Sequence, residues 1–513
     1  MRSGTAALIL THRRQRVVWI CLLLCLCFLL LDRWLILDQF AFRYVDDDQA
    51  ILWHGAMEMA QGHFHEPCFY GQRYNTLLEG FVAVPLFWMG VGPNVALPLV
   101  TSLLALFPFV LLAMVLVRKQ AYALAAFMLA FPVTLSPEFG MITAMPRGFV
   151  TGVFLASLAV LPLFSRRGVF LFLSPFFAIL ALFANPNAAL VLAPAGLLIL
   201  LQRHTDRRFY LLGAAGALPA AIIYYLGHHF YDVRSNYEVH VQWELDFTAA
   251  DIRLAALHYL DEISPLLWGK GWSVFVLLGS VVVALGAARQ WKQAIALFVG
   301  LLLLVVAFGI NKVNDGVPSV FYPWARMFLA VPFLLALFVA QLKGPSHRWL
   351  LLLMPVLAAG FFGYKWIVQG AAVERQTAAD RQKNMEVEEV RELRRQCLLI
   401  DQVARANQSR LMVIGWGRNK HLINYGCACL VRDFPGTLEP VLDRRTWWLQ
   451  EVAGQVVPNV LFAGFEEDGF AATPPSYPKL KRVSQEPLLF LLKGNTLRTD
   501  TLLNGMRMGL RPY

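Results

Sequence analysis

The chain has 513 residues, of which 58% are hydrophobic and only 15% are charged, and its mean hydropathy is +0.53. A soluble domain is closer to half apolar and a quarter charged, so this composition excludes an ordinary soluble protein and indicates an integral membrane protein. The formal net charge of +11 lies largely in short loops and in the C-terminal region, and it predicts no nucleic-acid partner.

Eleven apolar runs approach the length of roughly 20 residues that a helix needs to cross a bilayer. They are 17–36, 94–117, 121–137, 148–165, 168–184, 187–202, 209–227, 267–288, 293–310, 325–342 and 349–368, with a further apolar stretch at 77–91. Arg13, Arg14 and Arg16 precede the first run, as in a signal peptide, but no small-residue cleavage site follows it. We interpret this run as an uncleaved anchor.

The connections between the apolar runs alternate along the chain between basic and chemically varied ones. Short connections such as those at Arg118, Arg166 and Arg207 are basic, whereas every other connection is longer and chemically varied. The positive-inside rule then places the N-terminus in the cytoplasm. An odd number of spans places the first long loop, 37–76, and the C-terminal region on the outer side.

Three consecutive aspartates, Asp46, Asp47 and Asp48, lie in this first external loop. Ionised carboxylates beside hydrocarbon are costly, so the cluster is a candidate functional site. A helix is predicted from Asp46 to Gly62 with the acids at its N-terminus, and a solvated turn or a helix N-cap is the alternative role for them.

A polar patch follows this helix before the chain returns to the apolar stretch at 77–91. Its members carry imidazole, carboxylate, amide and guanidinium groups, and they are His63, His65, Glu66, Gln72, Arg73, Tyr74, Asn75 and Glu79. Such a loop is suited to a site at the bilayer surface.

Two arginines on the outer side occupy places where a loop enters a span. They are Arg147 in MPRGFV and Arg326 in YPWARMFL. A glycosyl transfer needs one carboxylate as general base and cations to stabilise a departing phosphate, and these residues supply both kinds of group. Snorkelling to the membrane interface is the alternative for both arginines.

Other external features have simpler interpretations. His228 and His229 could bind a metal, but an interfacial pair in an aromatic belt with Tyr224, Tyr225 and Tyr231 fits better. The pair Asp261-Glu262 could be a second acidic site, but a solvated loop before the next span fits better.

From residue 369 the composition becomes that of a soluble protein. We predict a transmembrane domain at 1–368 and a small external α/β domain at 369–513, with an amphipathic helix over 374–406 and strands in RLMVIGW, VLFAG and LLFLLK. Four cysteines fall on the outer side, where disulfides persist, and they are Cys68, Cys397, Cys427 and Cys429. Cys397 can pair with Cys427 or Cys429, and the spacing does not decide between them.

The first external loop resembles that of the GT-C superfamily of polyprenyl-phosphate-sugar-dependent glycosyltransferases. The similarity is to bacterial members related to protein mannosyltransferases and aminoarabinose transferases. An acidic pair at Asp47-Asp48 precedes AQGHF, FYGQRY and LLEGFVAVPLF in the order of the family, and Asp46 is an extra acid. The segment YPWARMFLAVPFLLAL resembles the late Arg-x-x-Leu-x-x-x-Pro segment of the family, and its arginine is Arg326 here.

The resemblance implies an α-helical polytopic membrane protein of GT-C-like fold in a bacterial inner membrane. It implies inverting transfer of a sugar from a polyprenyl-phosphate donor to an external glycan, lipid or protein acceptor. Asp47 or Asp48 would be the general base, and Arg326, with Arg147, would hold the leaving phosphate. The further substrate-binding residues that it implies are Asp46, Gln72, Tyr74 and Glu79.

The chain departs from the family at two places. Many members have Asp-Glu at the position of Asp47-Asp48, so the identity of the base stays open. Some relatives have basic residues where Asn75 and Thr76 stand here, so a contact with the donor cannot be carried over from those relatives to these two positions. Because relatives of this type do not need a metal for catalysis, we expect no essential cofactor, with a divalent ion at Asp46–Asp48 as the alternative.

A different class of protein is compatible with the same loop. A transporter or flippase of envelope precursors would use the acids for ion coupling, but it predicts acids near the bilayer midplane and related halves. We find the acids in a loop and no internal repeat. A non-catalytic scaffold for envelope glycan synthesis is the third alternative.

Overall fold

The structure is a computed structural model of the whole chain. It describes residues 2–69, 73–233, 248–254, 256, 260–310, 313, 319–342, 348–382, 386–414, 422–438, 454–463, 480–485, 487–499 and 501–502. The chain divides into two compact units. The helical unit is Met1–Phe40, Thr101–Tyr225 and Gln242–Gln376, and the mixed unit is Ala41–Val100, Leu226–Val241 and Thr377–Tyr513.

This division differs in membership from the predicted domains 1–368 and 369–513. The first loop, which carries the aspartates, belongs to the same compact unit as the C-terminal region. The division into a transmembrane domain and an external domain at residues 368 and 369 therefore stays a prediction.

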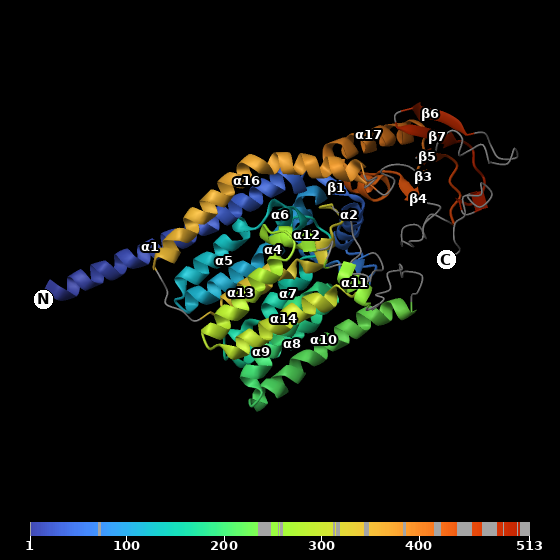
Figure 1. Ribbon diagram of the computed structural model, residues 1–513. Helices are drawn as coiled ribbons and strands as arrows, with labels where there is room; N and C mark the ends of the chain where they lie inside the picture. The colour runs from blue at the N-terminus through green and yellow to red at the C-terminus, as the bar shows by residue number, and fades with distance from the viewer. Residues whose placement is uncertain are drawn as a thin grey trace. The chain divides into compact units, whose positions relative to one another are not determined.

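The helical unit is built almost entirely from apolar helices. They are α1 (Arg2–Ile36), α4 (Pro93–Arg118), α5 (Tyr122–Thr134), α6 (Pro137–Ile142), α7 (Thr151–Ala159), α8 (Gly168–Ala184), α9 (Ala189–Arg203), α10 (Arg207–Val233), α11 (Ala249–Leu254), α12 (Leu260–Ile263), α13 (Ser273–Ala287), α14 (Trp291–Ala307), α15 (Ala330–Val339) and α16 (Arg348–Gln382). Short helical turns join them at η1 (Leu37–Ala41), η3 (Leu161–Leu163), η4 (Pro186–Ala188), η7 (Ser264–Leu267) and η9 (Trp324–Phe328). The two longest helices, α1 and α16, lie side by side (Figure 1).

Each of the eleven predicted spans contains an apolar helix. Five helical segments are long and apolar enough to cross a membrane by length and composition, and they are Gln15–Ala41, Pro93–Arg118, Pro186–Arg203, Arg207–Val233 and Trp349–Asp380. Shorter apolar helices account for the other predicted spans and for the stretch at 77–91. Several of the helices contain proline, which removes a backbone hydrogen bond. The chain is a multi-pass membrane protein.

The mixed unit combines helices with two β-sheets. Its elements are β1 (Tyr44–Asp46), α2 (Asp47–Ala60), α3 (Leu78–Trp88), β2 (Val387–Glu389), α17 (Val390–Ala406), β3 (Leu411–Ile414), η10 (Leu422–Gly426), α18 (Cys427–Leu430), β4 (Gly436–Leu438), β5 (Val460–Ala463), β6 (Lys481–Gln485) and β7 (Leu488–Leu492). The larger sheet has five strands in the order β4-β3-β5-β7-β6. Strand β3 is parallel to β4 and β5, and β7 is antiparallel to β5 and β6.

Helix α17 covers this sheet (Figure 1) and contributes two residues to a small buried core. Ile400 and Ala404 of the helix are buried against Met412, Leu461 and Leu489 of the three central strands. The strands predicted from RLMVIGW, VLFAG and LLFLLK are confirmed as β3, β5 and β7. These strands are buried along nearly their whole length, which is typical of a sheet covered on both faces.

The prediction of a single continuous amphipathic helix over 374–406 is wrong, because the structure has two helices there with a strand between them. Helix α16 continues to Gln382, and α17 begins only at Val390. Between them, β2 pairs antiparallel with β1, and the Val390 N–H donates to the Arg43 carbonyl. Pairing with a strand from the first loop therefore overrides the helix propensity of the local sequence.

A disulfide joins Cys397 of α17 to Cys427 of α18. This pairing decides between the two partners that the sequence allowed for Cys397. Cys68 is a buried free thiol, and Cys429 is also free. The bond fixes the small helix α18 to the helix that covers the sheet.

Candidate active site

The aspartate cluster forms the start of α2. Asp46 is fully buried, has extended backbone angles and is the N-cap, because its Oδ1 accepts a hydrogen bond of 2.9 Å from the Gln49 N–H. Asp47 and Asp48 follow in the first turn and are half-buried. The positive end of the helix dipole stabilises ionised carboxylates there. Asp46 is thus buried and engaged in capping, whereas Asp47 and Asp48 stay partly exposed.

Helix α2 packs closely against α3, which contains the predicted residue Glu79. A methyl group added at Gly80 would lie 3.0 Å from the Ala56 Cβ, so the two helices meet where neither has a bulky side chain. Glu79 is fully buried in the first turn of α3, and Tyr74 is half-buried just before it. Gln72 lies outside the described residues. The structure therefore brings two of the predicted binding residues to the helix pair that holds the aspartates.

The last turns of α10, which belong to the mixed unit from Leu226 onward, hold the polar loop that links α2 to α3. The Tyr231 hydroxyl donates to Glu66 Oε2 at 2.9 Å and accepts from the Cys68 N–H at 3.0 Å. Arg73 forms an ion pair of 2.9 Å with Asp232 and lies 5.8 Å from the centre of the Tyr231 ring. We did not predict these contacts, because Tyr231 was assigned to an interfacial belt of aromatic residues.

In the helical unit, the two predicted arginines meet at one aromatic ring. The guanidinium of Arg326 lies 4.1 Å from the centre of the Tyr322 ring, and that of Arg147 lies 5.6 Å from it. Arg326 also donates to the Pro323 carbonyl at 2.9 Å. Each arginine is only 3% exposed, so snorkelling to the interface does not describe either one. Two buried guanidinium groups thus lie around one aromatic ring, and we call this pair, Arg147 and Arg326, the cationic place.

A small apolar cavity of about 220 Å³ adjoins the segment that carries Arg326. Met327 and Phe328, which follow this arginine directly, line it together with Leu190 of α9 and Leu303 of α14. The cavity is suited to hydrocarbon because its walls are almost wholly aliphatic or aromatic.

A buried charged network positions the segment that leads to Arg147. Lys365 of α16 lies 3.0 Å from an Asp32 carboxylate oxygen of α1. The neighbouring Arg33 donates to the Gly140 carbonyl and to the Thr143 hydroxyl, both at 3.2 Å. The network thereby ties α6 to α1 and α16, and α6 is followed directly by the loop that carries Arg147. The charges at positions 32, 33 and 365 within apolar runs were the sequence signal for it.

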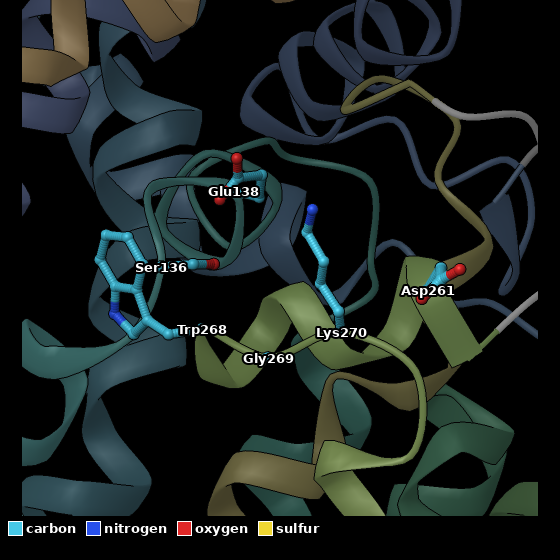
Figure 2. Close-up of a pocket in the computed structure, with 6 residues that line it drawn as sticks. All are labelled: Ser136, Glu138, Asp261, Trp268, Gly269 and Lys270. Atoms are coloured by element: carbon cyan, nitrogen blue, oxygen red, sulfur yellow. The ribbon is translucent and has the colours of Figure 1, made fainter.

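A polar pocket of about 490 Å³ lies beside α6 (Figure 2). Its lining residues are Ser136, Glu138, Asp261, Trp268, Gly269 and Lys270. Figure 2 shows the Lys270 side chain extending between Glu138 on one side and Asp261 on the other. The Gly271 N–H donates to Asp261 Oδ1 at 2.7 Å, which fixes the turn that presents Lys270.

The pocket offers donors and acceptors beside an indole, a combination that binds hydroxyl-rich molecules. Trp268 is held by a hydrogen bond from its indole N–H to the Thr134 carbonyl and by ring contacts with Phe361 and Tyr364. Asp261, which we expected in a solvated loop, is exposed but lines this pocket. The acid pair 261–262 thus contributes one carboxylate to a defined site.

The carboxylates Asp46–Asp48 do not form a group of convergent metal ligands in the described part of the chain. The group that does is Glu58, His63 and His65, at the other end of α2. His229 lies 3.9 Å from Asp232 and belongs to no such group among the described residues. The expectation that catalysis needs no metal stays a prediction.

No protein-family model matches the chain, and no curated protein matches it in sequence. Among solved structures, it is similar to ArnT from Cupriavidus metallidurans, in a crystal structure with bound undecaprenyl phosphate. The TM-score is 0.57 at 10% sequence identity, and the match covers 91% of this chain and 97% of ArnT. The chain therefore has the fold of ArnT, and the predicted GT-C-like, α-helical polytopic fold with a small C-terminal α/β region is confirmed.

Proposed function

We propose that the protein is a membrane glycosyltransferase that moves a sugar from a polyprenyl-phosphate donor to an external glycan, lipid or protein acceptor. The observation that carries the proposal is the convergence of Arg147 and Arg326 on Tyr322 beside an apolar cavity. A buried cationic place next to a hydrocarbon-lined cavity suits a phosphate on a prenyl chain. The fold is shared with ArnT, whose crystal structure contains undecaprenyl phosphate.

The reaction is an inverting displacement at the sugar carbon that bears the phosphate. The acceptor hydroxyl attacks this carbon and gives its proton to Asp47 or Asp48, while the bond from carbon to phosphate oxygen breaks. A positioned base contributes about 10²–10⁴-fold to such a step. Both carboxylates lie in the half-buried first turn of α2, at the positive end of the helix dipole, where a substrate can reach them.

The leaving group is a polyprenyl phosphate, whose negative charge grows in the transition state. Arg147 and Arg326 supply fixed positive charge for it in surroundings that exclude water, where electrostatic stabilisation is strongest. The hydrocarbon chain of the donor would occupy the cavity lined by Met327 and Phe328. The pocket with Glu138, Asp261 and Lys270 would bind the hydroxyl groups of a sugar.

The proposed location is the inner membrane, with the N-terminus in the cytoplasm and the C-terminal region on the outer side. The basic loops set this orientation. The disulfide between Cys397 and Cys427 supports it, because such bonds persist in oxidising compartments outside the cytoplasm.

The test is donor turnover by the full chain purified in detergent. Labelled polyprenyl-phosphate sugars are supplied with candidate acceptors, and the wild type is compared with Asp47→Asn and Asp48→Asn. We expect one variant to lose about 10²–10⁴-fold in turnover with only a small change in thermal unfolding. Asp433→Asn, at an exposed site in the same unit, is the matched control and keeps the wild-type rate.

A second experiment examines the cationic place. Removing one stabilising donor from a site of this type costs about 10²–10³-fold in turnover, and we expect this loss for Arg326→Gln. Arg289→Gln, on the connection between α13 and α14, is the matched control. Full activity in both aspartate variants would overturn the proposed base, and full activity of Arg326→Gln would overturn the proposed phosphate site.

A transporter of envelope precursors is the second candidate, and the buried pair of Asp32 and Lys365 within two apolar helices is the observation that favours it. Ion-coupled transport would move labelled lipid across proteoliposomes, and Asp32→Asn would abolish this movement. A transferase would instead consume the donor without net transport. The two experiments therefore separate the candidates.

A further inference from the structure

We propose that Glu58, His63 and His65 bind a divalent transition-metal ion, with Zn²⁺ as the ion that suits these donors. The site lies at the C-terminal end of α2, opposite to the end that carries the aspartates. It goes beyond the proposed transferase activity and does not depend on it.

The backbone at the end of α2 brings the two histidines back to the glutamate. Gln61 is the C-cap, and Gly62 follows with a φ of +90°, which reverses the chain. The Gly62 N–H then donates to the Met59 carbonyl, and the His63 N–H donates to the Glu58 carbonyl at 2.9 Å. This pair of bonds is the Schellman motif. It holds the His63 side chain beside that of Glu58.

The spacing of the donor atoms matches a metal site. Glu58 Oε2 lies 3.1 Å from His63 Nδ1 and 3.3 Å from His65 Nε2. All three atoms lie within 4.8 Å of one another. Tetrahedral Zn²⁺ with bonds of about 2.0–2.1 Å keeps neighbouring ligand atoms about 3.3 Å apart. An ion can therefore enter between these atoms with small side-chain movements.

Hydrogen bonding between the same groups is the competing explanation, and the surroundings favour the metal. Glu58 lies in the last turn of α2, where the helix dipole opposes an anion and favours a cation. Both imidazoles approach one carboxylate oxygen, so a single cation would satisfy all three groups at once. Zn²⁺ would also leave a fourth position toward solvent, because His63 is exposed.

The donor set also selects the kind of metal. Two imidazole nitrogens with one carboxylate suit Zn²⁺ and related transition metals, whereas Mg²⁺ and Ca²⁺ prefer sites made of oxygen. Bound metal would clamp residues 63–65 to α2. The next residue, Glu66, is held by Tyr231, so the ion would anchor the start of a loop whose adjoining residues the tyrosine already holds.

The test is metal content of the full chain in detergent. Protein stripped with a chelator is dialysed against Zn²⁺ alone, and bound metal is counted by elemental analysis. We expect one Zn²⁺ per chain, and at least a tenfold loss of affinity in His63→Ala and in His65→Ala. His204→Ala, which removes an exposed histidine outside the cluster, is the matched control and keeps the metal.

Two further measurements protect the test from unfolded variants. Glu58→Gln keeps a polar side chain beside the histidines, and we expect it to fold and to bind Zn²⁺ at least tenfold more weakly. Co²⁺ added to the stripped wild type is expected to give the visible absorption of a four-coordinate site. The proposal is overturned if the wild type binds no Zn²⁺ at micromolar concentration, or if the histidine variants bind it as tightly as the wild type. None of these readouts uses transferase activity, so failure here leaves the proposed function standing.

Discussion

The two ends of α2 support carboxylates by different means. At the N-terminus, Asp47 and Asp48 lie where the helix dipole itself stabilises negative charge, and Asp46 already satisfies the Gln49 N–H. At the C-terminus, the same dipole opposes Glu58, and hydrogen bonds from two histidines offset this effect. Asp47 and Asp48 at the first end are thus partly exposed on a terminus that favours negative charge, whereas the acid at the second end is held in a fixed cluster.

The largest difference between the two ends should appear in catalysis. In the double variant Asp47→Asn/Asp48→Asn, we expect turnover to fall by about 10²–10⁴-fold because the general base is lost. Each lost charge should lower the free energy of unfolding by only about 0.3–1 kcal/mol. Donor turnover and thermal unfolding of the same preparation measure both quantities. If the double variant is strongly destabilised but keeps the wild-type turnover per folded molecule, the two aspartates support the fold and do not supply the general base.

Acid should destabilise the C-terminal half of α2, which carries His54 and Glu58. Burial lowers the pKa of His54 to about 4, against its ordinary 6.5, so the unfolded chain takes up a proton below pH 6.5 while the folded chain does not. The free energy of unfolding should therefore fall as the pH drops from about 6.5 to 4, by an amount on the order of 3 kcal/mol. The lowered pKa of Glu58 adds to this loss at the acid end of the range.

Chemical unfolding at several pH values between 7 and 4 checks this expectation. His54→Gln should flatten the curve because it removes the group that titrates. An unchanged slope in this variant would show that another group causes the acid sensitivity.

The turn after α2 should be sensitive to a single methyl group. Gly62 has a φ of +90° with open space around it, so Gly62→Ala meets no neighbour and tests backbone conformation alone. We expect a loss of roughly 1–2 kcal/mol in the free energy of unfolding. The matched control is Gly196→Ala inside α9, where there is also open space and φ is not positive. Equal effects at the two glycines would contradict the role of the turn.

The smallest effect should come from the N-cap. Asp46→Ala should cost about 1 kcal/mol of unfolding free energy, because the Gln49 N–H loses its acceptor. Asp46→Asn keeps an acceptor at the same place and should cost only a fraction of that amount. Thermal unfolding of the two variants compares them directly, and equal losses would mean that the charge of Asp46 matters more than its hydrogen bond.

Local sequence patterns were enough to predict the elements that local forces decide. The apolar runs gave the helices of the helical unit, and the acids before a helical stretch that ends at Gly62 gave α2 with its bounds nearly correct. Short apolar stretches gave β3, β5 and β7. In each case the signal lies within the segment itself, as periodicity or as a terminating residue.

Contacts between distant segments were out of reach of the same patterns. Nothing near Tyr322 indicates that it joins Arg147 to Arg326, and nothing near Tyr231 indicates that it binds Glu66. The predicted helix over 374–406 failed for the same reason, since its break is caused by a partner strand in the first loop. The buried charges near residue 32 were visible in the sequence, but a search for apolar runs passes over them.

The pairing of β1 with β2 sets an order on biogenesis. Residues 44–46 are synthesised near the beginning of the chain, but their partners at 387–389 follow only after all the apolar helices that we expect to cross the membrane. The disulfide that fixes α17 must form later still. Helix α2 is thus made early and completed last, so a chain cut short before residue 387 would carry the three aspartates without the strand that secures their helix.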